Sequence, residues 1–144
     1  CYTHRHLFVQ LALELIKEGK NDKALKVLRK AEKVLPNYNV PNTFVSGSAD
    51  LARAYALLGQ KNDAKRLLNE VWDNTKSYAD YYVQLDGSRF DMCSDSLMRQ
   101  LYVMQSLSDV MRLIDAKQAD KWATVANNIY KMYQMKGGQP YEMQ

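Results

Sequence analysis

Two histidines near the start of the chain are the first candidates for metal or acid–base chemistry. His4 and His6 stand two positions apart, in a segment whose apolar spacing predicts a helix. Residues two apart point to different sides of a helix, so these two imidazoles cannot share a metal ion. Because the sequence contains no other histidine, we expect a surface or packing role for both.

The other reactive residue types are also spaced unfavourably for a site. Cys1 and Cys93 are the only cysteines, too few for a disulfide framework, and no Cys-x-x-Cys pair occurs. Asp86, Asp91 and Asp95 fit no calcium-loop spacing and are better explained as capping and loop residues. The sequence also lacks a glycine-rich phosphate loop and a nucleophile elbow. We predict no catalytic, cofactor-binding or metal-binding residues in this chain.

Composition is typical of a soluble globular domain. The chain has 144 residues, 47% hydrophobic and 25% charged, and no apolar run approaches the roughly 20 residues of a membrane span. The net charge is +4, and basic residues cluster between positions 17 and 33 with acidic residues among them. Such mixing is typical of a solvated helix face, so we predict no nucleic-acid binding. Because Cys1 replaces an initiator methionine, we expect a fragment or a processed product, with the lipidated cysteine of a lipoprotein as the alternative.

The most informative pattern is a spacing of small and apolar residues that recurs after forty positions. Ala12, Gly19, Ala24 and Leu28 correspond to Ala52, Gly59, Ala64 and Leu68. Apolar residues follow helical spacing on both sides of each glycine, which predicts two amphipathic helices joined by a tight turn. Since such a unit cannot bury its apolar face alone, we expect it to stack on a neighbour of the same kind.

Turn and breaker residues divide the chain into three predicted hairpins. The hairpins are expected at about 4–36, 43–86 and 92–136, in a single domain over residues 1–136, with a flexible tail at 137–144. The third helix is expected at about 43–58. Asn21 or Asp22 should cap the second helix and Asn62 or Asp63 should start the fourth. The predicted fold class is all-α, with three antiparallel helical hairpins stacked as a right-handed solenoid.

The first copy of the pattern resembles the tetratricopeptide repeat. The residues that carry this resemblance are Phe8, Leu11, Ala12, Leu15, Gly19, Ala24, Leu28, Ala31 and Pro36. The second copy departs from the family pattern at Lys76, which stands in place of a proline and fits a helix that runs on. The third hairpin matches only in its apolar spacing. The resemblance implies a TPR-like α-solenoid that binds other proteins.

A second resemblance covers about residues 5–86. The runs Phe8–Ala12, Leu15–Lys20 and Lys23–Leu25, and the residues from Leu35 to Pro41, look like the C-terminal region of certain Gram-negative multipass membrane proteins. Those proteins are related to protein-mannosyltransferase-type glycosyltransferases, and a pair like Tyr81-Tyr82 ends their second repeat. The resemblance implies a soluble appendage at the periplasmic face of the bacterial inner membrane, tethered through a missing N-terminal region. A lipoprotein or a cytoplasmic protein is the alternative.

The tetratricopeptide family binds partners in a groove lined by the first helix of each hairpin. Carried onto this sequence, the groove residues are His6, Val9, Leu13, Ile16 and Lys17, followed by Ala49, Arg53, Ala56 and Leu57. The apolar members either form a binding surface or are covered by the fifth and sixth helices, and Lys17 and Arg53 favour an acidic partner group.

We therefore expect a non-catalytic interaction module, monomeric or weakly dimeric. Its partner would be a protein or peptide segment, such as the membrane part of the same polypeptide. The alternative is an accessory part of a membrane glycosyltransferase that helps to position a lipid-linked sugar donor or acceptor.

Overall fold

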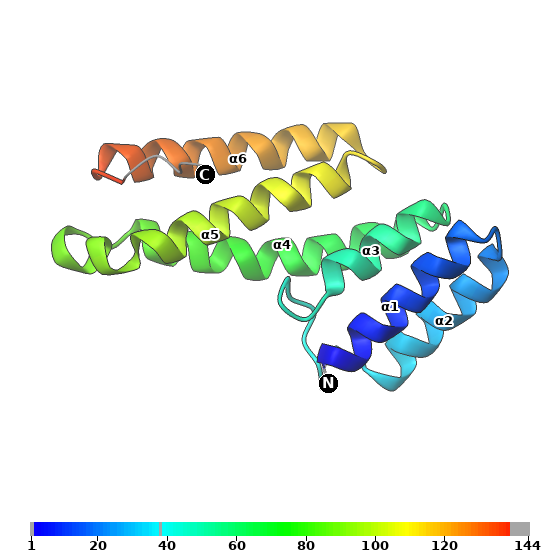
Figure 1. Ribbon diagram of the computed structural model, residues 1–144. Helices are drawn as coiled ribbons and strands as arrows, with labels where there is room; N and C mark the ends of the chain where they lie inside the picture. The colour runs from blue at the N-terminus through cyan, green and yellow to red at the C-terminus, as the bar shows by residue number, and fades with distance from the viewer. Residues whose placement is uncertain (1, 38, 139–144) are drawn as a thin grey trace. The chain divides into compact units, whose positions relative to one another are not determined.

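Six α-helices form the regular structure of the computed structural model, which describes residues 2–37 and 39–138 (Figure 1). They are α1 (Tyr2–Lys17), α2 (Asn21–Val34), α3 (Ser48–Leu57), α4 (Lys61–Val83), α5 (Gly87–Met111) and α6 (Ala116–Met135). The described residues contain no strand, so the predicted all-α class is confirmed. Within the same residues, no helix combines the length and the apolar character needed to cross a membrane.

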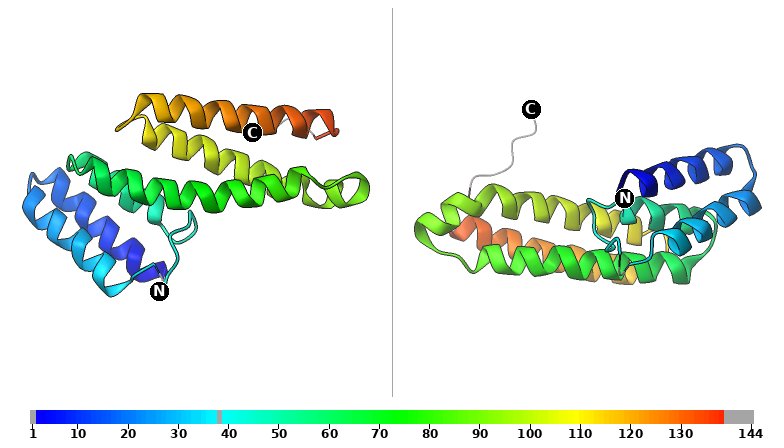
Figure 2. Two further views of the ribbon diagram at one scale, coloured as in Figure 1. Left: turned by 180° about the vertical axis from the view of Figure 1, so that it is seen from behind. Right: turned by 90° about the horizontal axis from the view of Figure 1, so that it is seen from below.

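The chain divides into two compact units, Cys1–Val71 and Trp72–Gln144. The boundary between them falls inside α4, whereas the sequence predicts a single domain over residues 1–136. In the first unit, α1 and α2 lie side by side as an antiparallel hairpin (Figures 1 and 2). In the second unit, α5 and α6 form another antiparallel pair.

Glycines end α1 and α3 in the same way. Gly19 has φ +76°, and the amide of Lys20 donates to the carbonyl oxygen of Leu15 at 2.8 Å. Gly59 has φ +75°, and the amide of Gln60 donates to the carbonyl oxygen of Tyr55 at 2.9 Å. This left-handed conformation is accessible to glycine without a Cβ clash. The two predicted helix ends are therefore confirmed.

Small residues let the helices of the first unit approach closely. The alanines at the corresponding positions, Ala12, Ala24, Ala52 and Ala64, are all fully buried. Leu28 and Leu68 are fully buried as well. The spacing that identified the two copies in the sequence thus marks residues of the core.

The third helix begins five residues later than the sequence predicts. Residues 43–47 form a turn in which the amide of Ser46 donates to the Thr43 hydroxyl at 3.2 Å, and the amide of Thr43 donates to the Ser46 hydroxyl at 3.0 Å. Gly47 then has φ +81°. Local hydroxyl–backbone bonds of this kind compete with helix formation, so α3 begins at Ser48.

The predicted cap of α2 is wrong, and α4 starts one residue before the predicted Asn62. The cap position of α2 is Lys20, which makes no side-chain cap hydrogen bond, and α4 begins at Lys61. Each glycine turn is so short that the next helix starts within two residues. Asn21 and Asp63 consequently lie inside the helices that they were expected to cap or start.

Aromatic stacking and apolar side chains form the core of the second unit. The indole rings of Trp72 and Trp122 stack with centroids 4.3 Å apart and planes 4° apart. α5 begins at Gly87, before the predicted hairpin start near 92, and its apolar stripe Leu97, Leu101, Met104, Leu107 and Met111 is buried. Gly137 has φ +85° and ends α6 as Gly19 ends α1, with the amide of Gly138 donating to the carbonyl oxygen of Tyr133 at 3.0 Å. The rest of the predicted tail, 139–144, lies outside the described residues.

Candidate functional site

A groove of about 470 Å³ opens between α1 and α3 in the first unit. Its lining residues are Gln10, Leu13, Glu14, Ile16, Lys17, Arg53 and Leu57. On α1, four of them follow the spacing of one helix face, and Arg53 and Leu57 stand one turn apart on α3. The sequence prediction named Leu13, Ile16, Lys17, Arg53 and Leu57, and the structure brings these five together.

Other predicted groove residues lie elsewhere. Val9 is 2% exposed and belongs to the core together with Arg5 and Ala12, so its placement in the groove is wrong. His6 lies against Gly47, since a Cβ built on that glycine would come within 2.8 Å of the imidazole. Ala49 is also buried. At the N-terminal end of α1, the buried face is the one that carries Arg5 and Val9. The family pattern did not indicate that this face is buried.

The groove carries one uncompensated positive charge. Lys17 and Glu14 form an ion pair with 3.2 Å between nitrogen and oxygen, but both side chains are mostly exposed. Exposed pairs of this kind contribute little to stability, and their charges largely cancel for a nearby ligand. Arg53 is exposed and has no ion-pair partner among the described residues. The groove therefore offers apolar walls from Leu13, Ile16 and Leu57 beside a single available guanidinium.

Arg5 is a buried cation that donates hydrogen bonds to the loop between α2 and α3. Its side chain is 2% exposed. One guanidinium nitrogen donates to the hydroxyls of Ser46 (2.8 Å) and Ser48 (3.0 Å) and to the carbonyl of Pro41 (3.3 Å). The other nitrogen donates to the backbone carbonyls of Leu35 (3.1 Å) and Val40 (2.7 Å). Burial lowers the pKa of Arg5, although a guanidinium stays protonated at neutral pH.

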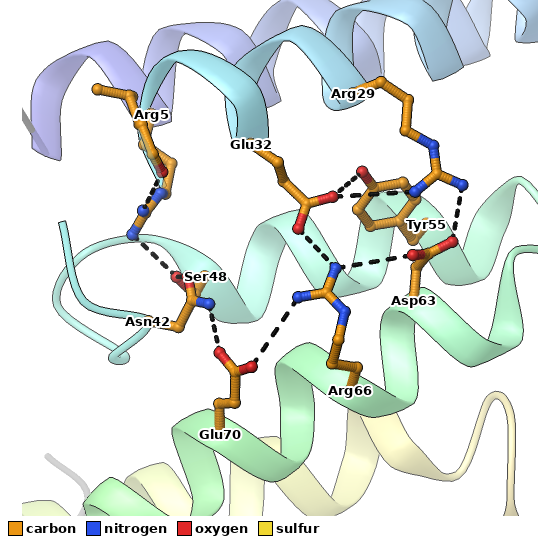
Figure 3. A network of polar contacts seen from close by, with 10 residues as sticks. Arg5, Arg29, Glu32, Asn42, Ser48, Tyr55, Asp63, Arg66 and Glu70 are labelled. Carbon is orange, nitrogen blue, oxygen red and sulfur yellow. Dashed lines mark hydrogen bonds and ion pairs between the residues drawn. The ribbon is translucent and has the colours of Figure 1, made fainter. Parts of the chain in front are cut away.

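A second polar network joins α2 to α3 and α4 (Figure 3). Arg29 donates to Asp63 at 2.8 Å and lies over the ring of Tyr55, 5.1 Å from its centroid. Glu32 accepts hydrogen bonds from the Tyr55 hydroxyl and from Arg66, the latter at 2.6 Å. Each hairpin thus supplies a cation and a carboxylate to the other, which fixes their register.

Further contacts link this network to the loop that Arg5 holds. The Arg66 guanidinium is 3.9 Å from the Glu70 carboxylate, which accepts a hydrogen bond from the side chain of Asn42. Asn42 in turn accepts from the Ser48 hydroxyl at 2.9 Å. Figure 3 shows the resulting chain of contacts from Arg5 to Arg29. No buried side-chain nitrogen or oxygen in the described part of the chain lacks a hydrogen-bond partner.

The network shifts the pKa values of its members in opposite directions. The hydrogen bond from Arg29 lowers the pKa of the Asp63 carboxyl. Burial, followed by the hydrogen bond to Glu32, raises the pKa of the Tyr55 hydroxyl. Both shifts favour the protonation states that make the observed contacts, with Asp63 charged and Tyr55 neutral.

Asp63→Asn should lower the free energy of unfolding by about 1 kcal/mol at pH 7, because it removes the charge that Arg29 and Arg66 contact. Since the folded-state pKa of Asp63 is lowered, its contribution is complete above the ordinary aspartate pKa and is lost as pH falls through the folded-state value. The difference between wild type and Asp63→Asn should therefore shrink below about pH 4 in urea titrations. Asp95→Asn, at an exposed position of α5, serves as the control, and an equal loss in that variant would contradict the assignment.

Sequence reasoning missed both networks, although part of the signal was present. Arg29 and Glu32 stand three apart on α2, as do Asp63 and Arg66 on α4, and the charge order is reversed between the two helices. When a cation and a carboxylate on one helix stand in the opposite order to those on another helix, the two helices can pair their charges face to face. The role of Arg5 had no such signal, because its partners lie 30 to 43 residues away in an irregular loop.

The residues considered for catalysis do not gather into a site. No cluster of three or more histidine, cysteine, aspartate or glutamate side chains able to hold a metal occurs among residues 2–37 and 39–138. Cys93 is a half-buried free thiol, and Asp86 forms an ion pair with Lys136 at 2.9 Å. Cys1 lies outside the described residues.

Comparison with known proteins adds no family assignment. The chain matches no protein-family model, no curated protein and no solved structure. The groove and the two polar networks are therefore the observations on which a function can be argued.

Proposed function

We propose that this chain is a non-catalytic interaction module of the TPR-like α-solenoid type. Its groove between α1 and α3 binds a protein segment that carries an acidic group beside apolar side chains. The observation that carries this proposal is the combination of apolar walls with the uncompensated charge of Arg53. A carboxylate on the partner would form a charge-assisted hydrogen bond with this guanidinium, and Leu13, Ile16 and Leu57 would cover apolar side chains on either side of it.

The rigid support of the groove favours this role. Arg5 and the network from Arg29 to Glu70 hold α1, α2, α3 and the start of α4 through side-chain contacts of 3.9 Å or less. A preformed groove loses little conformational entropy when a ligand binds. The alternative in which the chain positions a lipid-linked sugar has no comparable support from the described residues.

The parent protein forms a separate part of the proposal. The resemblance of residues 5–86 to the C-terminal region of bacterial multipass membrane proteins supports a tethered domain on the periplasmic side of the inner membrane. A tether raises the effective concentration of a partner segment to the millimolar range when its linker is short. A groove with one charged anchor would then suffice, and the free chain would be monomeric or weakly dimeric.

Arg53→Glu combined with Leu13→Glu should weaken ligand binding at least tenfold without unfolding the chain. Arg53 is exposed and Leu13 half-buried, so both positions tolerate a polar side chain, while the double change places carboxylates where the ligand presents its own. A displayed library of short random peptides provides the probe. We expect the wild-type chain to enrich peptides that combine acidic and large apolar residues, with affinities at least tenfold weaker for the double variant.

The matched control is Arg99→Glu combined with Leu113→Glu, which makes the same changes at exposed positions of the second unit. This variant should bind the selected peptides as the wild type does. Selected peptides that bind the groove variant and the wild type equally would refute the groove as the binding surface.

A further inference from the structure

The second hairpin, formed by α3 and the start of α4, buries one of its faces against the first hairpin. Gly47 lies against His6, and the Ser48 hydroxyl accepts a hydrogen bond from Arg5 at 3.0 Å. Further along α3, Tyr55 contacts α2 through its hydroxyl and its ring. Leu51, one turn before Tyr55, is 1% exposed. The chain therefore contains an example of how a helical hairpin covers this kind of face.

The first hairpin has a corresponding face that no part of the described chain covers. We call it the open face, and it is formed by the residues forty positions earlier: Leu7, Phe8, Leu11, Leu15, Lys23 and Lys26. Leu7 is 58% exposed and Leu11 is 52% exposed, although Leu51 at the position matching Leu11 is buried. Two neighbouring leucines on one helix face, both more than half exposed, form an apolar surface that water solvates poorly.

The charges of the open face differ from those of the covered face. On the covered face, Asp63 contacts Arg29 and Arg66 contacts Glu32, so the covering helix supplies one cation and one carboxylate. The matching residues on the open face are Lys23 and Lys26, two cations. Both are exposed and have no ion-pair partner in the part of the chain that the structure describes. A hairpin that covered this face in the same way would need carboxylates at both contact positions.

The surface beside Lys26 is also hollowed. A shallow recess of about 490 Å³ is lined by Asp22, Leu25, Lys26 and Arg29. It places a cation and a leucine next to each other. The open face thus presents an apolar strip on α1 and a pair of lysines on α2, and the recess adjoins it at Lys26.

We infer that the open face docks an acidic amphipathic helical hairpin from another protein. The hairpin packs on α1 through Leu7 and Leu11, and its second helix places carboxylates three residues apart against Lys23 and Lys26. This site is separate from the groove, because Leu13 and Lys17 line the groove whereas Leu7 and Leu11 do not.

The test uses a probe built from the only hairpin known to cover such a face. A stapled peptide of residues 2–36 carries Arg29→Glu, so that two carboxylates, at 29 and 32, face the lysines of the full chain. It also carries Leu11→Lys, which removes the open face of the probe and prevents self-stacking. The control probe keeps Arg29 and carries Glu32→Lys with Leu11→Lys. Calorimetric titration into the full chain should show one-to-one binding of the acidic probe and at least tenfold weaker binding of the basic one.

Variants of the full chain then locate the binding site. Leu11→Glu should weaken binding of the acidic probe at least tenfold. Leu113→Glu, at a similarly exposed leucine of the second unit, should leave the affinity for this probe unchanged. Lys23→Glu with Lys26→Glu should reverse the preference and favour the basic probe. Circular dichroism checks that each exposed substitution leaves the helices intact.

Four results would overturn the inference. The first three are equal binding of both probes, full binding by Leu11→Glu, and a dimer of the wild-type chain that Leu11→Glu dissociates, which would make a second copy the occupant. The fourth is loss of probe binding in the variant Arg53→Glu with Leu13→Glu, which would place the probe in the groove. None of these results refutes the proposed groove.

Discussion

Arg5→Met should lower the free energy of unfolding by about 3–5 kcal/mol, because several neutral acceptors would lose one shared donor at once. Methionine fills a similar volume but donates no hydrogen bond. Three carbonyl oxygens of the loop, at Leu35, Val40 and Pro41, would lose the guanidinium donor that they share. Each acceptor left buried without a donor is costly. Urea denaturation followed by circular dichroism measures the loss.

Two further variants sharpen this experiment. Arg5→Lys keeps the charge but replaces the planar fork with a point charge, so it should recover only part of the stability. Arg99→Met makes the same change as Arg5→Met at an exposed position of α5 and should cost less than about 0.5 kcal/mol. A loss for Arg5→Met no larger than that of Arg99→Met would show that water can replace the guanidinium in the loop.

Trp122→Ala should destabilise the second unit by about 3–5 kcal/mol. Trp122 is 3% exposed and stacks on Trp72, which is 5% exposed, so the change removes both buried area and the stacked pair. Trp122→Phe keeps an aromatic ring and should lose less. Because the substitutions alter tryptophan emission, far-UV circular dichroism during thermal unfolding is the suitable measurement.

Met135→Ala is the control for this prediction. Met135 belongs to the same helix but is 85% exposed, so its truncation should change stability by less than about 0.5 kcal/mol. If Met135→Ala and Trp122→Ala shifted the unfolding midpoint equally, the indole stack would not be a principal contact of the second unit.

The helices of this protein could be predicted from the sequence because their determinants are local. Gly19 and Gly59 each end a helix through a left-handed residue, and a glycine after an apolar helical repeat is a sufficient signal for that. Ala24 and Ala64 are buried because helices cross there, which their spacing indicated. The error at residues 43–47 has a local cause as well, since Thr43 and Ser46 bond to the backbone in a way that apolar spacing does not report.

The candidate site could be predicted only in part. Leu13, Lys17, Arg53 and Leu57 were identifiable because the resemblance to the tetratricopeptide repeat implies a groove along the first helix of each hairpin. Val9 was misplaced because Arg5, one turn earlier, draws that side of α1 into the core. A buried arginine with partners in a distant irregular loop leaves no periodic pattern, so the sequence could not indicate where this side of α1 points.

The position of the boundary inside α4 has a consequence for how the chain can be divided. A fragment that ended at Val71 would keep about three turns of α4, which is shorter than an isolated helix needs for stability in water. Those turns carry Asp63 and Arg66, so their helicity would depend on the ion pairs with α2. A fragment that began at Trp72 would likewise start in the middle of a helix, without a cap and with its tryptophan at the frayed end. Neither unit can therefore be excised cleanly, and a useful cut has to retain α4 from Lys61 to Val83.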